Sequence, residues 1–566
     1  MSDDSSSFSP QRDQLPPEIR ALVAKLGYGS LPEQITHVRS VPAREAITAP
    51  WPRWVHAEVR QAFESLGVPE PYLHQVEAAD CAHRSMVSAP EIPTGAQKHL
   101  ILATGTASGK SLSYLLPSLD AVHRGKLAPK RGLDEDRATV LYLSPTKALA
   151  ADQLNSIRAL GLPTVRAETY DGDTPLSERR WIRQHANVIL CNPDMLHFGI
   201  LPNHSQWSSF LRRLKYVILD EAHSYRGVFG AHIAVLMRRL RRICRHYGSS
   251  PVFFGASATS ADPARSFAQL LGVREENITA ITRDTAPHGA THTILWEPEF
   301  REKVSDKLSA IRDTGQSEAE KNAPQRKSVI EQSAEMLTDL VVDRTRTIAF
   351  IKSRRGAEAI AQTASRYLDE VETGLSHRVS AYRSGFLPEE RRELERALRS
   401  GEILGIASTS ALELGIDIAG LDAVLVAGWP GTRASFFQQI GRAGRAGQDS
   451  LSVLIASADP LDTYLVHHPE DIFTVVEATV FDPANPYVLS PHLCAAAAEL
   501  PLRAEEVELF GPSVGALLER LIEQGYLRKR ATGWFWTHPE NASALVDLRG
   551  GGGSQRQIVS EELAER

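Results

Sequence analysis

Short apolar runs alternate with amphipathic stretches over a long first block of the chain, from about residue 70 to 285. Buried parallel strands appear in a sequence as short apolar runs, and the helices between them cover the two faces of the sheet. The alternation therefore predicts an α/β domain with a parallel sheet and helices on both faces. Its expected strands are 99–102, 139–143, 187–191, 216–220 and 252–256.

A second block from about 286 to 480 repeats the pattern. Two α/β blocks of similar size predict tandem domains with a cleft between them, and such interfaces commonly bind ligands. The expected strands of this block include 346–351, 403–407, 423–426 and 452–455.

The flanking segments differ from these blocks. Residues 1–69 begin with a polar, proline-containing tail and continue as short predicted helices separated by prolines. In 485–540, a helical stripe is followed by a predicted hairpin at 526–536, which together outline a winged-helix-like domain. Residues 541–566 do not resemble a complete domain, so we expect the chain to be a fragment with a truncated tail.

Hydropathy, cysteine spacing and net charge limit the compartment and the kinds of binding site that we expect. No apolar run approaches the roughly 20 residues that span a bilayer, and the first residues lack a signal-peptide pattern, so we expect a cytoplasmic protein without a membrane partner. The four cysteines form no Cys-x-x-Cys pair, which predicts buried free thiols. A net charge of −6 gives no overall attraction to nucleic acid, so any such binding needs local sites.

The stretch from 103 to 111 has the context of a phosphate-binding loop: an apolar run precedes it and a helical pattern follows. Backbone N–H groups and the dipole of a helix N-terminus hold phosphate oxygens. Lys110 is expected to reach the β- and γ-phosphates of ATP, and Ser111 to hold Mg²⁺. The predicted nucleotide-binding residues here are Thr104, Gly105, Thr106, Ala107, Ser108, Gly109, Lys110 and Ser111.

Two adjacent carboxylates end the apolar run Val217-Ile-Leu-Asp-Glu-Ala-His223. In a nucleotide site Asp220 is expected to hold Mg²⁺ beside Ser111, and Glu221 to orient and deprotonate the attacking water. Phosphoryl transfer depends mainly on such positioning and charge neutralisation.

A basic motif lies in the second block, Gln438-Gln-Ile-Gly-Arg-Ala-Gly-Arg445. Arg442 and Arg445 are three residues apart, so we expect them to share one helix face. Directed across the cleft, they are predicted to stabilise the transferring phosphoryl group as arginine fingers.

The ordered set of phosphate loop, Asp-Glu-Ala-His box, Ser257-Ala-Thr259 and Gln-x-x-Gly-Arg-x-x-Arg resembles a superfamily-two DExH-box (DEAH) helicase with two RecA-like domains. The resemblance implies ATP and Mg²⁺ as cofactors. It also implies that Gln75 reads the adenine, and that Gly415 and Asp417 couple nucleotide to nucleic acid.

The same resemblance assigns the nucleic-acid contacts. Hydroxyls, backbone N–H groups and a few cations bind the strand through its phosphates without reading bases. In the first domain these residues are Pro145, Thr146, Lys147, Gly172, Asn192, Pro193 and Asp194. In the second domain they are Ser353, Arg354, Tyr382, Arg383, Ser408 and Thr409.

The wording of the motifs is similar to the bacterial mitomycin-repair helicases and their fungal RecQ-four-like relatives. This resemblance implies an ATP-dependent DNA helicase that moves 3′ to 5′ on single-stranded DNA and acts in DNA repair. The expected partners are single-stranded and tailed duplex DNA and repair proteins, with the chain itself a monomer. Such helicases carry a C-terminal region with four metal-binding cysteines. Because the cysteines here are dispersed, we expect no zinc in this chain.

Three alternatives remain. An RNA helicase would use the same phosphate contacts, since only the 2′-OH distinguishes RNA. A double-strand translocase would remodel complexes without unwinding. A scaffold protein with a degenerate ATPase is disfavoured, because the lysine, the acidic pair and the arginines are all present.

Two basic features have competing interpretations. The arginines at 238, 239, 241, 242 and 245 lie on one predicted helix, and we favour a solvated outer face over a DNA contact. The hairpin at 526–536 combines cations with Trp534 and Trp536. It is predicted equally to bind nucleic acid or to pack its tryptophans onto the helix that bears Leu517 and Leu521.

Overall fold

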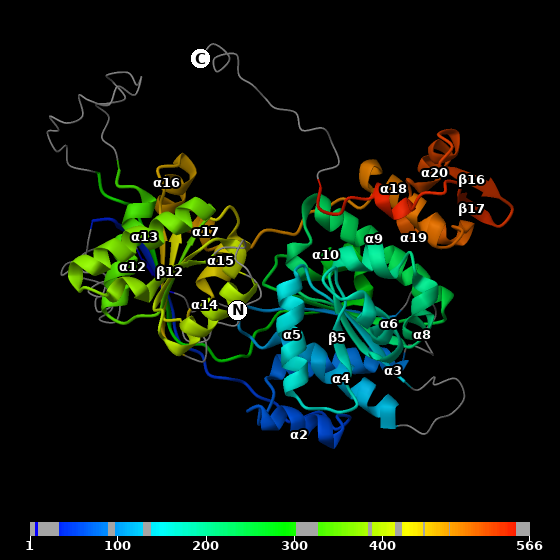
Figure 1. Ribbon diagram of the computed structural model, residues 1–566, viewed down its shortest axis with the longest axis horizontal. Helices are drawn as coiled ribbons and strands as arrows, with labels where there is room; N and C mark the ends of the chain where they lie inside the picture. Colours follow the sequence, from blue (N-terminus) through cyan, green and yellow to red (C-terminus); the bar gives the residue numbers. More distant parts are fainter. Residues whose placement is uncertain are drawn as a thin grey trace, which may run out of the picture.

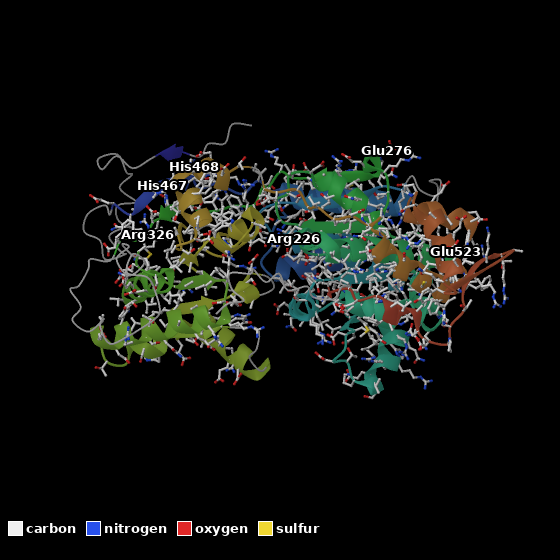
Figure 2. The ribbon with its side chains drawn as sticks, turned by 90° about the horizontal axis from the view of Figure 1, so that it is seen from above. Arg226, Glu276, Arg326, His467, His468 and Glu523 are labelled. Atoms are coloured by element: carbon white, nitrogen blue, oxygen red, sulfur yellow. The ribbon has the colours of Figure 1, made fainter. Side chains whose placement is uncertain are left out.

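The computed structural model describes residues 6–8, 33–88, 97–127, 137–300, 326–382, 388–413, 421–444, 448–474 and 476–550 of the 566. Two α/β domains lie side by side, and a smaller C-terminal unit packs on the first (Figure 1). Seen from above, the second domain and the C-terminal unit lie at opposite ends of the molecule, with Arg226 near the junction of the two α/β domains (Figure 2).

The first domain is built on a seven-stranded sheet in the order β5-β6-β4-β7-β8-β3-β9, in which every pair is parallel. All five apolar runs predicted as strands are strands, and the edge strands β5 and β9 complete the sheet. The strands are β3 (His99–Ala103), β4 (Thr139–Leu143), β5 (Ala167–Thr169), β6 (Val188–Cys191), β7 (Leu214–Leu219), β8 (Val252–Ser257) and β9 (Ile278–Ile281).

Helices cover both faces of this sheet, as predicted. One face packs against α3 (Leu73–Ser88), α4 (Lys110–Leu127) and α5 (Lys147–Ala159). On the other face lie α6 (Leu176–His185), α8 (Ser208–Arg212), α9 (Gly227–His246) and α10 (Pro263–Leu271). The hydrophobic core between the sheet and this second group of helices continues into the C-terminal unit. The phosphate loop thus lies between a fully buried strand and the N-terminus of a buried helix.

An eight-stranded sheet forms the second domain, in the order β1-β2-β10-β15-β14-β11-β13-β12. Its first two strands, β1 (Ser6–Phe8) and β2 (Ile35–Val41), come from the N-terminal segment and pair antiparallel with each other. Its six parallel strands are β10 (Thr291–Trp296), β11 (Thr347–Ile351), β12 (Val379–Tyr382), β13 (Gly405–Ser408), β14 (Ala423–Ala427) and β15 (Ser450–Ile455). Helices α12 (Val329–Val342) and α13 (Arg354–Val371) cover one face. The other face packs against α14 (Pro388–Ser400), α15 (Arg433–Ile440), α16 (Pro460–His467) and α17 (Pro469–Ile472).

The N-terminal segment connects the two domains. It contains a helix as predicted, α2 (Ala57–Ser65), but also a strand that was not predicted, β2 (Ile35–Val41), which pairs antiparallel with β10 of the second domain. The chain then crosses to the first domain, where α2 packs on α4.

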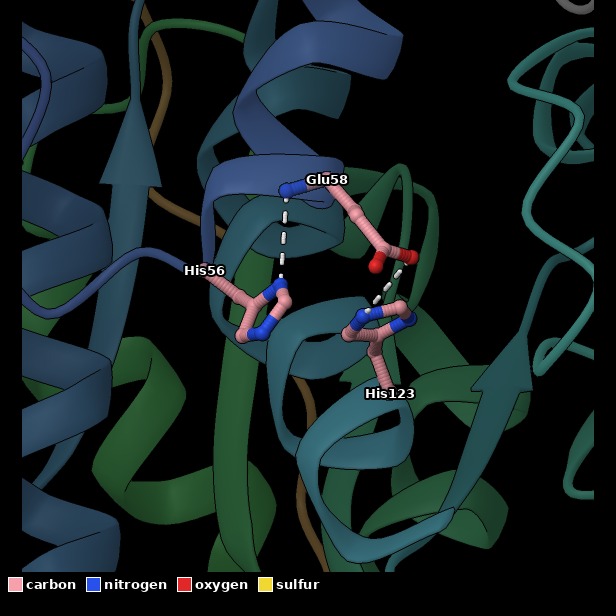
Figure 3. A group of neighbouring side chains, drawn as sticks. All are labelled: His56, Glu58 and His123. Atoms are coloured by element: carbon pink, nitrogen blue, oxygen red, sulfur yellow. Dashed lines mark hydrogen bonds and ion pairs between the residues drawn. The ribbon is translucent and has the colours of Figure 1, made fainter. Parts of the chain in front are cut away.

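Three polar side chains attach α2 to α4 (Figure 3). His56 caps α2 by accepting the Glu58 N–H at Nδ1, and the Glu58 carboxylate lies 3.4 Å from Nε2 of the buried His123. The ligand-type atoms of these residues come within 4.8 Å of one another. Because Glu58 is exposed and the cap and ion pair account for the grouping, we interpret it as a structural link.

The buried arginines of helix α9 contradict both interpretations of their charge, and of the five arginines only Arg245 is exposed. Arg239 and Arg242 are buried, with side chains 0% and 1% exposed, so they belong neither to a solvated face nor to a DNA contact. Arg239 pairs with Glu499, and Arg242 donates to the carbonyl of Ala496 at 2.7 Å. Both partners lie on α18 (Pro486–Glu499) of the C-terminal unit. The arginines thus fix that unit to the first domain.

The C-terminal unit has the predicted helix and hairpin. After α18 come α19 (Val507–Phe510), α20 (Val514–Glu523), β16 (Leu527–Arg530) and β17 (Gly533–Trp536). Trp534 and Trp536 are partly buried against the core that contains Leu517 and Leu521, which favours the packing interpretation of the tryptophans. The basic side chains of β16 are exposed.

Two predictions from composition can be compared directly with the structure. All four cysteines are free thiols, as predicted. Cys191, Cys244 and Cys494 are buried, whereas Cys81 is only partly buried. Among the described residues, no helix is both long enough and apolar enough to cross a bilayer.

Candidate ATP site and nucleic-acid surface

The phosphate loop joins β3, which ends at Ala103, to α4, which begins at Lys110. Its turn is closed by the Thr104 and Ser108 hydroxyls, 2.7 Å apart, and Ser108 donates to the Gly105 carbonyl at 3.0 Å. Lys110 Nζ donates to the carbonyls of Thr104 and Gly105 at 3.2 and 2.7 Å. The ammonium is therefore held inside the curve of the loop. Thr104 stands at the position of the first glycine in the Gly-x-x-x-x-Gly-Lys-Ser phosphate-loop pattern, and its hydroxyl fixes this curve.

Two neighbouring side chains of α3 brace the loop from outside. Gln75 donates from Nε2 to the Gly109 carbonyl at 2.8 Å, and His74 contacts the Ser108 carbonyl through Nε2 at 3.0 Å. Gly109 has φ +72°, which favours glycine, and a Cβ there would lie 2.5 Å from Gln75 Nε2 and displace that side chain. The adenine-reading role of Gln75 stays a prediction. His74 was not predicted from the sequence as a site residue, although it directly precedes Gln75.

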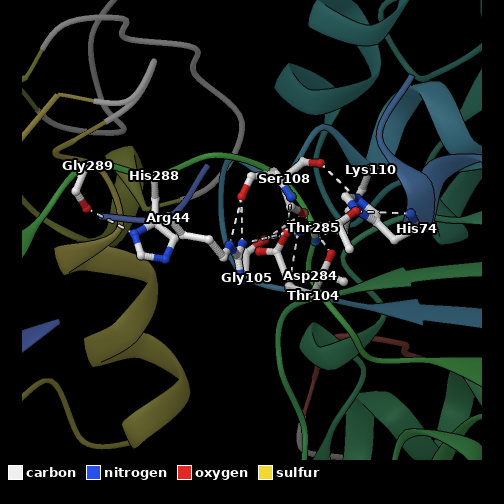
Figure 4. A network of polar contacts seen from close by, with 11 residues as sticks. Arg44, His74, Thr104, Gly105, Ser108, Lys110, Asp284, Thr285, His288 and Gly289 are labelled. Atoms are coloured by element: carbon white, nitrogen blue, oxygen red, sulfur yellow. Dashed lines mark hydrogen bonds and ion pairs between the residues drawn. The ribbon is translucent and has the colours of Figure 1, made fainter. Parts of the chain in front are cut away.

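A second network reaches the loop from the N-terminal and interdomain segments (Figure 4). Arg44 pairs with Asp284 at 3.2 Å, and the Asp284 carboxylate lies close to Gly105. Thr285 contacts His74 Nδ1 at 2.7 Å. Burial lowers the pKa of His74, so its ring bridges Ser108 and Thr285 as a neutral group. No sequence motif marked Arg44 or Asp284.

Asp220 follows β7 and lies in the centre of a hydroxyl cluster. Its Oδ2 accepts from Tyr114 at 3.1 Å, and the same hydroxyl lies 3.2 Å from Ser111 Oγ. Tyr142 also donates to Oδ2. The two predicted Mg²⁺ ligands, Ser111 and Asp220, are thus brought together around Tyr114.

The charge state of Asp220 fits a cation site. Burial, with the neighbouring Glu221 carboxylate, raises the pKa of Asp220 to about 6. A divalent cation would offset this desolvation, and Mg²⁺ prefers hard oxygen ligands such as this carboxylate and the Ser111 hydroxyl. The residues present therefore fit Mg²⁺, with Asp220 and Ser111 as the groups that would hold it.

His223 connects the acidic box to both neighbouring motifs. It accepts the Ala258 N–H at Nδ1 (3.1 Å), and its Nε2 contacts the Gln438 amide of the second domain. Burial, with the nearby Lys110 charge, lowers the pKa of His223 to about 4, so the ring is neutral. The Glu221 carboxylate lies 3.5 Å from Nδ1. One imidazole ring therefore contacts the second domain and also lies beside the Glu221 carboxylate.

The phosphate loop also touches the second domain directly. Thr106 Oγ1 donates to the Gly441 carbonyl at 3.3 Å. A Cβ at Gly441 would lie 1.9 Å from the Thr106 hydroxyl oxygen, so this approach requires glycine. The cleft predicted between the domains is therefore closed at this point by one glycine and one threonine.

Replacing Gly441 by alanine should lower the maximal ATPase rate by about 10- to 100-fold, because an ångström-scale displacement at a catalytic interface costs that much. Steady-state kinetics measure this change. Gly515→Ala is the control, since a Cβ there meets no atom within 4 Å. Equal rates for both variants would show that the Thr106–Gly441 contact is not needed.

The prediction that Arg442 and Arg445 share one helix face is wrong. Helix α15 ends at Ile440, and Gly444 has φ +75°, so Arg442 lies in the turn beyond the helix. Its guanidinium is buried and donates to the Glu413 carbonyl inside the second domain. A role at the γ-phosphate stays a prediction for Arg442. Arg445, like Gly415, Asp417 and Arg383, lies outside the described residues.

The predicted nucleic-acid residues of the first domain follow the carboxyl ends of β4, β5 and β6, which are adjacent strands. Thr146 caps α5 and Asn192 caps α7 (Pro193–Met195), so both oxygens already accept backbone N–H groups. Lys147 pairs with Asp173 at 2.8 Å, next to Gly172. The structure brings this set to one edge of the sheet. Whether it binds nucleic acid stays a prediction.

The residues of the second domain form a matching group after the adjacent strands β11, β13 and β12. Ser353 caps α13, of which Arg354 is the first residue, and Thr409 caps the turn after Ser408. Tyr382 is 2% exposed, so its side chain belongs to the core. The backbone beside Tyr382 remains the candidate contact at that position.

Family comparisons agree with this architecture. The DEAD/DEAH box helicase family matches residues 86–267, and the helicase conserved C-terminal domain matches 332–447. The winged helix domain of ATP-dependent helicase HRQ1 matches 481–551, which confirms the predicted winged-helix domain.

Whole-chain relatives extend the match. The uncharacterized ATP-dependent helicase YprA of Bacillus subtilis is 35% identical over 532 residues, which cover 93% of this chain and 64% of YprA. ATP-dependent helicase HRQ1 of Saccharomyces cerevisiae is also 35% identical, over 93% of this chain and 46% of HRQ1. The chain thus spans less than two thirds of these curated relatives. The crystal structure of DUF1998 helicase MrfA bound to DNA and AMPPNP matches with TM-score 0.79 and 35% identity, over 94% of this chain and 68% of that one. The chain belongs to the superfamily-two DEAD/DEAH-box helicases, in the group that contains MrfA and HRQ1.

Proposed function

We propose that this chain is the motor of an ATP-dependent DNA helicase that moves 3′ to 5′ on single-stranded DNA and acts in DNA repair. One observation carries the proposal: the phosphate loop and acidic box contact the second domain through Thr106–Gly441 and His223–Gln438. Hydrolysis at this junction is thereby linked to the relative position of two surfaces that both carry predicted strand-binding groups.

Lys110 and the N–H groups at the start of α4 bind and orient the phosphates of ATP. When bound, Mg²⁺ supplies charge neutralisation of the phosphate oxygens, and Ser111 and Asp220 are the groups that would hold it. Glu221 orients the attacking water and accepts its proton. Closure of the second domain on the loop excludes bulk water from these groups. Arg442 and Arg445 are proposed as the arginine fingers. The guanidinium of Arg442 donates to the Glu413 carbonyl within the second domain.

DNA is favoured over RNA because the solved structure of MrfA, similar over nearly the whole chain, is described as bound to DNA. We propose single-stranded and tailed duplex DNA as substrates, a monomer as the working form, repair proteins as partners, and the cytoplasm as the compartment. Binding through phosphates predicts weak sequence preference.

Unwinding of matched 3′- and 5′-tailed duplexes tests the directional part of this proposal. ATP-dependent displacement from the 3′-tailed substrate alone is expected. Displacement from the 5′-tailed substrate alone would overturn the polarity. Displacement of a triplex strand without unwinding would identify a double-strand translocase instead, and ATPase stimulation by RNA but not DNA would identify an RNA helicase.

Glu221→Gln should lower ATP hydrolysis by at least about 10²-fold while leaving ATP bound, since the amide still fills the site but cannot accept a proton. Single-turnover hydrolysis and nucleotide-binding titrations measure the two properties. Glu275→Gln, at an exposed position of the same domain, is the control. Unimpaired hydrolysis in the Glu221 variant would remove Glu221 from the mechanism.

A further inference from the structure

After the winged-helix hairpin the chain returns to the first domain. Residues 541–550, here called the C-terminal strap, are held by buried side chains: Val546 and Leu548 are each 2% exposed. The Ser543 carbonyl lies 2.9 Å from Nε2 of His197 in the turn Leu196–Ile200, which directly follows α7. The strap is therefore anchored next to the 192–194 loop independently of its last residues.

Arg549 is the strap residue that reaches the predicted strand-binding edge. Its Nε and Nη2 donate to Asp194 Oδ2 at 2.9 and 2.8 Å, and Nη2 donates to the Pro145 carbonyl at 3.0 Å. The guanidinium carbon lies 5.2 Å from the ring centre of Phe229. Asp547 accepts the backbone N–H groups of Arg549 and Gly550, which fixes the turn that presents this side chain. One guanidinium thus joins the loops that follow β4 and β6.

The negative charge of Asp194 gives a reason for its contact with Arg549. Its side chain is 30% exposed at an edge where phosphates are expected to bind, and a bare carboxylate would repel them. Arg549 neutralises this carboxylate, and its own side chain is 52% exposed, so the guanidinium remains accessible from solvent. Exposed ion pairs add little to folding stability, and the strap is already anchored by its apolar residues. A purely stabilising role therefore explains little of this geometry.

We propose that Arg549 is a positioning residue of the nucleic-acid-binding surface: it ties the 144–147 loop to the 192–194 loop and masks Asp194, so that single-strand phosphates bind across both. The inference rests on the proposed function, because it presumes that this edge binds a single strand. It assigns the strap, which carries no helicase motif, a part in gripping DNA.

The test uses the full chain and an oligothymidylate as probe. We expect Arg549→Ala to raise the DNA concentration for half-maximal ATPase by about tenfold with little change in the maximal rate, as for loss of one backbone cation. Arg549→Lys should recover part of the affinity, because it restores the charge without the fork. Arg274→Ala, which also removes an exposed arginine paired with a glutamate in the first domain, should leave the value unchanged.

Adding Asp194→Asn to Arg549→Ala separates masking from other roles. Removal of the exposed carboxylate should restore DNA affinity to within about threefold of the wild type, because the repulsion disappears with its source. A double variant as weak as Arg549→Ala would overturn the proposal, as would an unchanged DNA affinity in Arg549→Ala or an equal loss in Arg274→Ala. Thermal melting of each variant identifies a folding defect, and a large loss of Tm in Arg549→Ala would also overturn it. If DNA does not stimulate the wild-type ATPase at all, the proposed function is wrong. If DNA stimulates the wild type and Arg549→Ala equally, only this inference is wrong.

Discussion

Replacing Lys110 by alanine is expected to abolish DNA-stimulated ATP hydrolysis, with a fall of at least about 10³-fold, because the lysine is the cation that contacts the β- and γ-phosphates in this class of site. The structure places its ammonium within the curve of the loop, on the carbonyls of Thr104 and Gly105. Malachite-green or coupled-enzyme assays at saturating ATP and DNA measure the change.

Lys98→Ala is the matched control, since Lys98 is an exposed lysine of the same domain, one residue before β3. It should hydrolyse ATP at the wild-type rate. Near-wild-type turnover in Lys110→Ala would contradict the assignment of the loop at 104–111 as the ATP site, whatever the other motifs indicate.

Breaking the Arg239–Glu499 pair should produce the largest loss of stability. Both side chains are essentially buried, and removal of one partner strands a buried charge at a cost of roughly 3–5 kcal/mol. His197 and His492 also contact the guanidinium, at 2.8 and 3.0 Å. Burial and the arginine charge lower the pKa of both histidines, so neutral rings accept its N–H groups. Arg239→Ala therefore leaves several buried groups without partners, and thermal or urea unfolding measures the loss.

Arg245→Ala, an exposed arginine of the same helix, should change the free energy of unfolding by less than about 0.5 kcal/mol. The pair Arg239→Met with Glu499→Leu removes both charges and should recover a large part of the lost stability. A full loss in Arg245→Ala, or no loss in Arg239→Ala, would contradict the account of how the C-terminal unit is attached.

Local pattern was sufficient to predict the strands that are short apolar runs buried along nearly their whole length, such as β3, β4 and β8. The edge strands β5, β9 and β12 are only partly buried and were not predicted. Local pattern was also sufficient to place the loop at 104–109 between a strand and a helix, and Asp220 directly after a strand. The strand β2 was missed because its partner, β10, lies about 250 residues away. Pairing at that separation leaves no signal in the segment itself.

The arginines of α9 also have partners that are distant in the sequence and that local pattern does not reveal. A run of cations on an amphipathic helix is usually solvated, and nothing local to residues 238–245 indicates that Glu499 and Glu506 will meet them. The motif at 438–445 likewise predicted phosphate chemistry, but it did not indicate that α15 ends before Arg442. His223 as an interdomain link and Arg549 on the strap are properties of tertiary contact, which only the structure provides.

The central claim is that ATP hydrolysis at the junction of the two domains is coupled to a single DNA strand. The most direct measurement is the ATPase rate of the wild-type chain titrated with single-stranded DNA, beside duplex DNA and RNA of matched sequence. The account predicts saturable stimulation by single-stranded DNA that exceeds stimulation by either of the others and disappears in Lys110→Ala. A rate that is the same with and without single-stranded DNA would contradict it.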